Sequence, residues 1–268
     1  MKLWYQSLAR QTESTPYGKL LRATIADAVD PGTTVDMRGV QNTAGIGVHY
    51  KLLEHHDMRE VIYNAMQAER EGYDAFLVGN ISDAGLREAR ECVNIPVLGL
   101  CETSLHVACM MGASFGLVTI SPKWDARVRE NVARYRLEHR CAGLEPIETS
   151  PIELKRAMVD LPFRRGIIDQ FNKAAQKLLD KGAEVIIPAG GDIIVFLAES
   201  HTYEIQRAPI VNGIVELVKM GEMAAKLRKI TGRFTSKRLT YAPPEGDYLK
   251  RAREFYGDGV YPAARVEK

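Results

Sequence analysis

The sequence predicts an α/β fold made of two pseudo-symmetric three-layer halves, with mostly parallel sheets and an inter-domain cleft. Short apolar runs alternate with helical patterns along most of the 268 residues, as in folds built from parallel strands and covering helices. The segment 72–85 also recurs at 182–192: in each, a glycine and an acidic residue precede an apolar strand that ends in a turn of small residues. We therefore expect each half to contribute one turn to a shared cleft.

Length and composition bound the class of protein. The chain is 46% apolar, which is ordinary for a globular protein, and carries a net charge of +2 at pH 7. It has no long Lys/Arg block and no apolar run long enough to span a bilayer, so we expect neither nucleic acid nor a membrane as a partner. Residues 1–6 do not resemble a signal peptide. We therefore expect a cytoplasmic protein.

The cysteines give no sign of a metal centre or a disulfide framework. Cys92, Cys101, Cys109 and Cys141 form no Cys-x-x-Cys pair and have no histidine at zinc spacing. We interpret them as free thiols in buried or half-buried positions, and we expect neither a metal nor a cofactor. Cys101 has one alternative role, because a helix start could lower the pKa of a nucleophilic thiol there.

Apolar periodicity and helix-boundary residues predict the elements in order. The segment 17–29 has apolar residues at helical spacing and stops at Asp30-Pro31-Gly32, and Asp57 is placed to cap the next helix. Strands are predicted at 3–5, 33–37, 75–78, 95–100, 115–120, 144–148, 185–187 and 210–211. Helices are predicted at 17–29, 58–71, 83–91, 101–111, 124–139, 163–181, 192–199 and 214–229.

Domain organisation follows from this order. We expect residues 1–105 plus 212–232 to form the first α/β half and 106–211 the second, with 233–268 as a C-terminal extension. The glycine-rich stretch 38–49 is predicted to be a loop that covers a site. The extension is aromatic and contains several prolines, and we predict no helix or strand in it.

Five segments carry a resemblance to a known family: Trp4-Tyr5-Gln6-Ser7, 72–86, 96–102, 116–119 and 182–191. In order and spacing they resemble the aspartate/glutamate/hydantoin racemase superfamily, and most of all its hydantoin and allantoin racemase branch, over roughly the first 230 residues. The resemblance implies two facing cysteines, one from each half. One thiolate removes the α-proton and the other thiol returns it on the opposite face. The resemblance also implies a homo-oligomer.

This sequence departs from the family pattern at both catalytic positions. They fall on Asn80 and Gly190, and neither residue can exchange a proton, so we do not expect two-thiol chemistry. Asn80 could instead donate a hydrogen bond to a carbonyl or carboxylate oxygen as part of an oxyanion hole. Its alternative role is structural, since asparagine tolerates the backbone of a tight turn.

Four titratable residues are candidates for proton transfer. Asp192 follows the second turn and is the first choice for a general base or a metal ligand, with helix capping as the alternative. Glu102 lies just past a strand and is predicted to be a base or a first-turn acid that suits the helix dipole. His201 and His49 could swing into the cleft and act as acid or base near neutral pH.

The remaining candidates are residues at turns and strand ends that could bind substrate through backbone amides and polar side chains. They are Gln6, Ser7, Gly79, Ile81, Ser82, Thr119, Ser121, Gly190 and Gly191. Ser82 also lies where a helix is predicted to begin, so an N-cap is its alternative role.

Together these features predict an enzyme that acts on a small carboxylate or a cyclic amide such as a hydantoin-like ring. Hydrolysis, decarboxylation or isomerisation without cysteine is the preferred chemistry. Two alternatives stay open: a racemase or epimerase with a displaced acid/base pair, and a non-catalytic binder of small molecules.

Overall fold

The computed structural model describes residues 1–45 and 50–264 and has the predicted α/β fold with parallel sheets. The first sheet has the order β2-β1-β3-β4 and the second the order β6-β5-β7, and all these strands pair in parallel. The first sheet contains β1 (Lys2–Arg10), β2 (Thr34–Val40), β3 (Ala75–Val78) and β4 (Val97–Gly99). The second contains β5 (Phe115–Thr119), β6 (Cys141–Pro146) and β7 (Val185–Ala189), and a short hairpin is made of β8 (Glu204–Ile205) and β9 (Ala208–Pro209).

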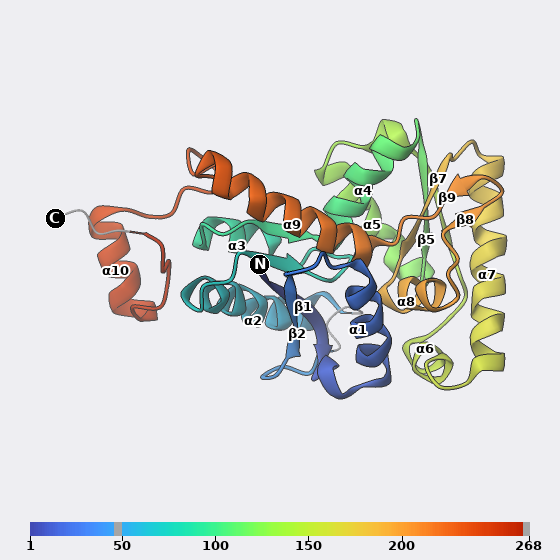
Figure 1. Cartoon of the computed structure of the whole chain (residues 1–268), viewed down its shortest axis with the longest axis horizontal. Coiled ribbons are helices and arrows are strands. Elements are labelled where there is room, and N and C mark those ends of the chain that lie inside the picture. Colours follow the sequence, from blue (N-terminus) through green and yellow to red (C-terminus); the bar gives the residue numbers. More distant parts are fainter. Residues whose placement is uncertain (46–49, 265–268) are drawn as a thin grey trace.

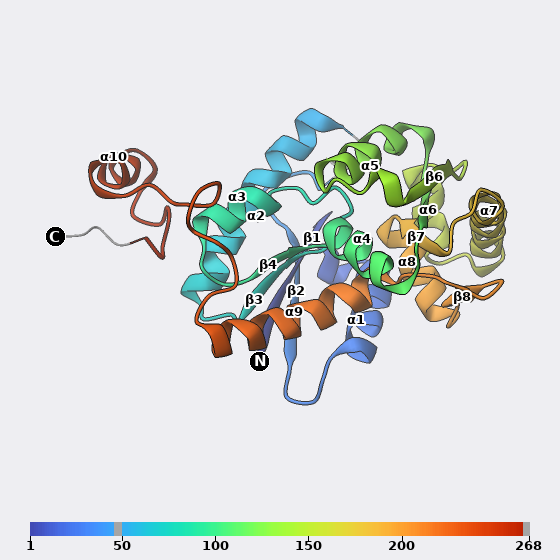
Figure 2. The ribbon, with the colours of Figure 1, turned by 90° about the horizontal axis from the view of Figure 1, so that it is seen from above.

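Helices connect these strands and cover the sheets (Figure 1). Those of the first half of the chain are α1 (Pro16–Ala28), α2 (Lys51–Arg70), α3 (Leu86–Cys92) and α4 (Leu100–Met111). They are followed by α5 (Pro122–Arg134), α6 (Pro151–Ala157), α7 (Leu161–Asp180), α8 (Gly191–Glu199), α9 (Gly213–Thr231) and α10 (Gly246–Tyr256). In both views α7 and α10 lie at opposite ends of the molecule (Figures 1 and 2). None of the described helices is long and apolar enough to cross a membrane.

The internal repeat is present in the backbone and in its hydrogen bonds. Gly72 and Gly182 end α2 and α7 with positive φ values of 76° and 90°, a conformation that favours glycine. Two residues later, Asp74 accepts a 2.8 Å hydrogen bond from the amide of the second residue of the chain, at the start of β1. Glu184 likewise accepts a 2.6 Å bond from the amide two residues before β5. The same kind of bond thus links β3 to β1 in the first sheet and β7 to β5 in the second.

The two sheets exchange their last helices. α4 follows the first sheet but packs against β7 and β5 as well as β4, whereas α9 follows the second sheet and packs against β3 and β4. α4 and α9 also pack on each other. α9 approaches the first sheet so closely that a β-carbon at Gly221 would lie 2.7 Å from the Leu77 side chain.

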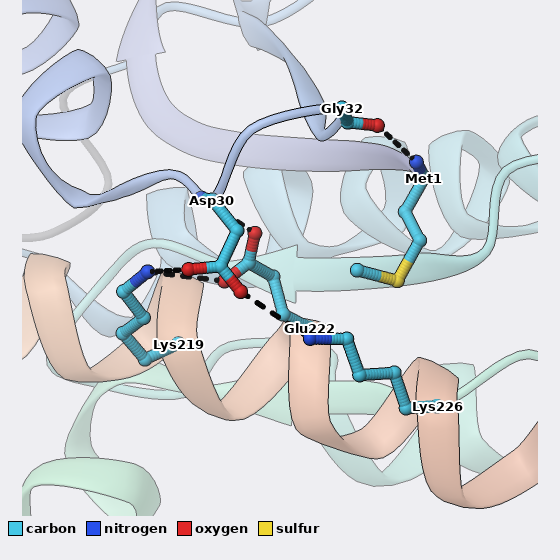
Figure 3. A network of polar contacts seen from close by, with 6 residues as sticks. All are labelled: Met1, Asp30, Gly32, Lys219, Glu222 and Lys226. Carbon is cyan, nitrogen blue, oxygen red and sulfur yellow. Dashed lines mark hydrogen bonds and ion pairs between the residues drawn. The ribbon is translucent and has the colours of Figure 1, made fainter.

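A polar network fixes α9 to the loop after α1 (Figure 3). Glu222 accepts a 2.9 Å hydrogen bond from the amide of Asp30, and Lys219 donates a 2.6 Å bond to the Asp30 carboxylate. Lys226 binds the other carboxylate oxygen at 3.3 Å. The bond from Lys219 is the main reason that the pKa of Asp30 is lowered from its ordinary value. The network therefore ties two segments that lie far apart in the sequence.

Some of the observed elements differ from the prediction. α2 begins at Lys51, so Asp57 lies inside the helix and does not cap it. Residues 210–211 do not form a strand. Ile210 makes only a single parallel bridge, to Ile186 of β7. The structure also adds α6 and α10, both in segments where no helix was predicted.

The apolar core is continuous across the halves. One cluster joins buried residues of both sheets, including Leu77, Leu117 and Ile187. A second cluster, around Trp4 and Phe76, fills the space between the first sheet and the helices α2 and α3. Burial of this much apolar surface on both faces of each sheet is what parallel strands require.

Candidate active site

A cavity of about 520 Å³ lies between the two halves, at the carboxyl ends of β1, β3, β5 and β7. This is where open parallel sheets bind ligands. Apolar side chains form most of its wall, among them Leu8, Leu100, Ile120, Trp124, Leu154 and Met158. Leu154 belongs to α6 and Met158 directly follows it, so a helix that was not predicted from the sequence forms part of the wall.

Seven of the predicted site residues come together around this cavity. They are Ser7, Gly79, Asn80, Ile81, Gly190, Gly191 and Asp192. The turn after β3 and the turn after β7 therefore line the same space, as the repeat predicted.

The Asn80 side chain is fixed within its own turn. Its carbonyl oxygen accepts hydrogen bonds from the amide and the hydroxyl of Ser82, at 2.9 and 2.6 Å. This pattern determines which way the amide group points. Among the described residues none accepts a hydrogen bond from its Nδ2, so that N–H is available to a ligand.

Asp192 lies in the first turn of α8 and lines the same cavity as Asn80. Burial raises the pKa of its carboxyl to about 6, while the hydrogen bond from its own amide and the charge of Lys155 act in the other direction. Lys155 also lines the cavity, from α6. A carboxylate with this pKa is mostly ionised at neutral pH and is still basic enough to accept a proton.

Two predicted site residues are engaged elsewhere. Glu102 forms an ion pair with Arg90 on α3 and does not line the cavity. Gln6 is completely buried on the other face of the first sheet, where it accepts hydrogen bonds from Trp4 at 3.0 Å and Asn64 at 2.9 Å. Both side chains therefore have structural partners in this conformation.

The other hydroxyl-bearing candidates lie close to the cavity but outside its wall. Thr119 is buried at the end of β5 and is hydrogen-bonded to Asp125 on α5. Ser121 precedes the first residue of α5 without a side-chain capping bond. Ser82 opens onto a separate polar pocket beside α2 and α5, together with Asp83.

Of the two histidine candidates, only His201 belongs to the described residues, and it lies outside the site. His201 lies in the turn after α8, exposed and with a positive φ of 50°, and does not line the cavity. His49 lies outside the described residues. Among the described residues no group of three or more His, Cys, Asp or Glu side chains could hold a metal ion.

A helix was predicted to begin at Asp83, but in the structure this residue has a different role. α3 begins only at Leu86, and the Asp83 carboxylate instead accepts bonds from the amides of Cys101 and Glu102 at 2.9 and 2.8 Å. It thereby caps α4 from a neighbouring turn. Tyr135, directly after α5, donates a third bond at 2.6 Å.

Tyr17, Trp124 and Lys155 are among the cavity-wall residues that sequence reasoning missed. Tyr17 lies at the start of α1, and a β-carbon at Gly191 would be 2.6 Å from its hydroxyl oxygen. Each of the three comes from a helix whose position depends on tertiary packing. No local motif marks them.

Over residues 18–221 the chain matches the family described as Asp/Glu/Hydantoin racemase, and this stretch includes both turns. The chain belongs to this family. It is 30% identical over 197 residues to the hydantoin racemase of Pseudomonas sp. (strain NS671), covering 74% of this chain and 75% of that protein. Its fold is similar to that of the allantoin racemase from Klebsiella pneumoniae, with a TM-score of 0.76, 22% identity, and coverage of 91% and 94% of the two chains. A more distant fold neighbour is arylmalonate decarboxylase, with a TM-score of 0.53, 15% identity, and coverage of 84% and 92%.

The cavity of this family member lacks the two cysteines that the resemblance implies. The positions at which the resemblance implies cysteines are occupied by Asn80 and Gly190, and both line the cavity. Of the described cavity wall, no residue is a cysteine. Cys101 is completely buried near the N-terminus of α4, where burial raises the pKa of its thiol well above the ordinary value. A raised pKa keeps the Cys101 thiol protonated and so does not favour a nucleophilic thiolate.

Proposed function

We propose that this protein is a cofactor-independent enzyme that acts on a small carboxylate or hydantoin-like cyclic amide by cysteine-independent hydrolysis, decarboxylation or isomerisation. One observation carries the proposal: of the described residues that line the cavity, Asp192 is the only carboxylate and none is a thiol. Asp192 is then the general base, and Asn80 takes the place of a proton-transferring group on the facing turn.

The chemistry follows from the properties of the two side chains. Ionised Asp192 accepts a proton from the substrate carbon next to a carbonyl, or from an attacking water molecule. The Nδ2 of Asn80 donates a hydrogen bond to an oxygen that becomes negatively charged. The apolar wall lowers the local dielectric and strengthens both interactions, and it accommodates an apolar substituent of the substrate.

The residue types at Asn80 and Asp192 distinguish the proposed reactions from racemisation. Inversion needs a proton donor and a proton acceptor on opposite faces of one carbon, but an amide on the Asn80 side cannot transfer a proton. The arrangement therefore favours reactions in which a single face exchanges protons. A racemase or epimerase with a displaced acid/base pair is the second candidate, and the 30% identity to a hydantoin racemase favours it. A non-catalytic binder is the third candidate.

A panel of hydantoins and small carboxylates followed by NMR in D₂O tests these candidates. Ring opening or release of carbon dioxide supports the first candidate, solvent deuterium with inversion supports the second, and tight binding without turnover supports the third. Asp192→Asn is expected to lower kcat by about 100-fold. Asp247→Asn is the matched control, since its side chain is 89% exposed on α10. Full activity of Asp192→Asn on a substrate that the wild type converts would exclude Asp192 as the base.

A further inference from the structure

A tyrosine carried by the first half covers the start of α8. Tyr17 is the second residue of α1, where Pro16 takes the first helical position and Thr15 accepts a 3.0 Å hydrogen bond from the amide of Gly18. α1 packs against α8. A β-carbon at Gly191 would lie 2.6 Å from the Tyr17 hydroxyl oxygen, so this hydroxyl rests directly on the turn after β7.

The Tyr17 hydroxyl is free to bind a ligand. Tyr17 lines the cavity, and no described side chain or backbone group is hydrogen-bonded to its hydroxyl. Asp192 is the neighbour of Gly191, so hydroxyl and carboxylate are at the same end of the cavity. Burial, with a contribution from the Asp192 charge, raises the pKa of Tyr17 well above its ordinary value. The hydroxyl therefore keeps its proton at neutral pH and acts as a donor.

We infer that Tyr17 is a catalytic residue that donates a hydrogen bond to the substrate carbonyl oxygen on which negative charge develops. This inference rests on the proposed function and deepens it, because it adds a donor on the Asp192 side of the cavity to the one on the Asn80 side. The ligand chemistry that it specifies is an amide or carboxylic carbonyl next to the reacting bond.

In all three reactions an electron pair moves onto the carbonyl oxygen of the substrate. In isomerisation the C–H proton goes to Asp192 and its electron pair moves to the carbonyl oxygen as an enolate. In decarboxylation the pair of the broken C–C bond moves to the carbonyl oxygen as an enolate, carbon dioxide leaves, and the enolate carbon takes a proton from the protonated form of Asp192. In hydrolysis the attacking water forms the C–O bond and gives its proton to Asp192 while the carbonyl π pair moves to the oxygen. Collapse of this oxyanion breaks the C–N bond, and Asp192 returns the proton to the leaving nitrogen. In each case Tyr17 keeps its own proton and stabilises the oxyanion through the hydrogen bond.

Tyr5 supplies a matched control close by. Its hydroxyl lies 2.5 Å from where a β-carbon of Gly79 would be, so a second tyrosine touches the other turn in the same way. Unlike Tyr17, the Tyr5 side chain is completely buried, and its hydroxyl has no hydrogen-bond partner. Since it is not exposed to the cavity, it cannot bind a substrate oxygen in this conformation.

The test compares Tyr17→Phe, Tyr5→Phe and Asp192→Asn on a substrate that the wild type converts. Tyr17→Phe is expected to lower kcat by about 100-fold with KM changed less than about twofold, as for loss of one oxyanion donor. Tyr5→Phe is expected to retain kcat within about twofold. If Asp192→Asn loses activity and Tyr17→Phe does not, the inference is wrong and the proposed function stands. If Asp192→Asn keeps full activity, the proposed function itself fails.

A second measurement does not need turnover. In protein labelled with ¹³C at tyrosine Cζ, the resonance that disappears in Tyr17→Phe is expected to shift when hydantoin is added, while the Tyr5 resonance stays in place. Asp192→Asn is expected to move the ionisation of the Tyr17 resonance to lower pH, because a nearby negative charge is removed. An unmoved Tyr17 resonance with hydantoin bound overturns the inference. Failure of hydantoin and simple carboxylates to bind at all overturns the proposed function.

Discussion

The hydroxyl of Tyr135, directly after α5, donates a 2.6 Å hydrogen bond to the carboxylate of Asp83, in the turn after β3. α5 follows β5 of the second sheet, so this bond joins the two halves of the molecule. Asn131, one helical turn earlier, donates a 3.1 Å bond to the carbonyl of Ile81 in the same turn. The second half therefore fixes the turn that holds Asn80.

Removing that bond is expected to weaken the junction. Tyr135→Phe leaves the buried Asp83 carboxylate with only two backbone donors, and we expect the free energy of unfolding to fall by about 1–3 kcal/mol. Urea unfolding of wild type and variant measures the difference. Tyr63→Phe on the surface of α2 is the control, because that ring is 50% exposed. Equal losses for both variants would show that the buried bond contributes nothing specific.

The pH dependence of stability gives a second prediction about Asp83. Burial raises the pKa of its carboxyl to about 7, from an ordinary value near 3.8. The folded state therefore prefers the protonated form. The resulting stabilisation is complete below about pH 4 and is lost as the pH rises through about 7.

We compare wild type with Asp83→Asn, which cannot titrate at this position. The unfolding free energy of wild type relative to the variant is expected to fall by about 4 kcal/mol between pH 4 and 8. Asp192 and Glu216 also have raised pKa values, but they are present in both proteins and cancel. A difference that rises with pH would mean that the three hydrogen bonds outweigh burial.

The network in Figure 3 allows a prediction about how α9 is held. Glu222 is 2% exposed and accepts bonds from the Asp30 amide and from Lys219. Glu222→Ala leaves the Asp30 amide without this acceptor and Lys219 with Asp30 alone, and it is expected to cost about 3 kcal/mol of stability. Lys226→Met removes an exposed ion pair of the same network and is expected to change stability by less than about 1 kcal/mol. Thermal or urea unfolding of the two variants measures these losses of stability. A similarly small loss for both would show that the hydrogen bonds of Glu222 contribute little to stability.

Thiol chemistry can be restored in a designed variant. Asn80→Cys combined with Gly190→Cys places thiols at both positions that the family resemblance implies. A β-carbon at Gly190 would overlap the branched side chain of Ile120, so the double variant is expected to lose about 1–3 kcal/mol of stability. Adding Ile120→Leu removes the branch at the β-carbon with little change in volume and is expected to recover part of that loss.

The activity of this triple variant is the informative measurement. Two facing thiols are expected to exchange the α-proton of a hydantoin with solvent deuterium and to invert the carbon, as NMR and chiral chromatography would detect. Inversion at the same rate by the wild type would contradict the view that its chemistry is independent of cysteine. Gly190→Ser with Asn80→Ser has similar steric demands without thiols and is the control.

Much of the architecture could be predicted because it depends on local pattern. The short apolar runs gave the parallel strands, and the two matching turns located the cavity wall at Asn80 and Asp192. The helix α6 was missed although a signal existed: Ser150 and Glu153 form a capping box. By contrast, Asp57 resembled a helix cap, but the helix extends to Lys51 through residues that also favour helix.

The remaining features depend on tertiary packing. Tyr17 reaches Gly191 only because α1 of one half packs against α8 of the other. Glu102 was expected near the substrate, but Arg90 from α3 pairs with it outside the cavity. No residue pattern within either segment specifies such partners. The sequence therefore predicted the two turns of the site more accurately than the residues of other helices that contact them.

The exchange of α4 and α9 constrains the order in which the chain can fold during synthesis. α9 covers β3 and β4, yet it is made more than a hundred residues after them. Until residue 231 has left the ribosome, the apolar face of the first sheet lacks its final helix, while α4 awaits β7. Neither sheet can complete its core alone, so the nascent chain must remain only partly packed until most of it has been translated.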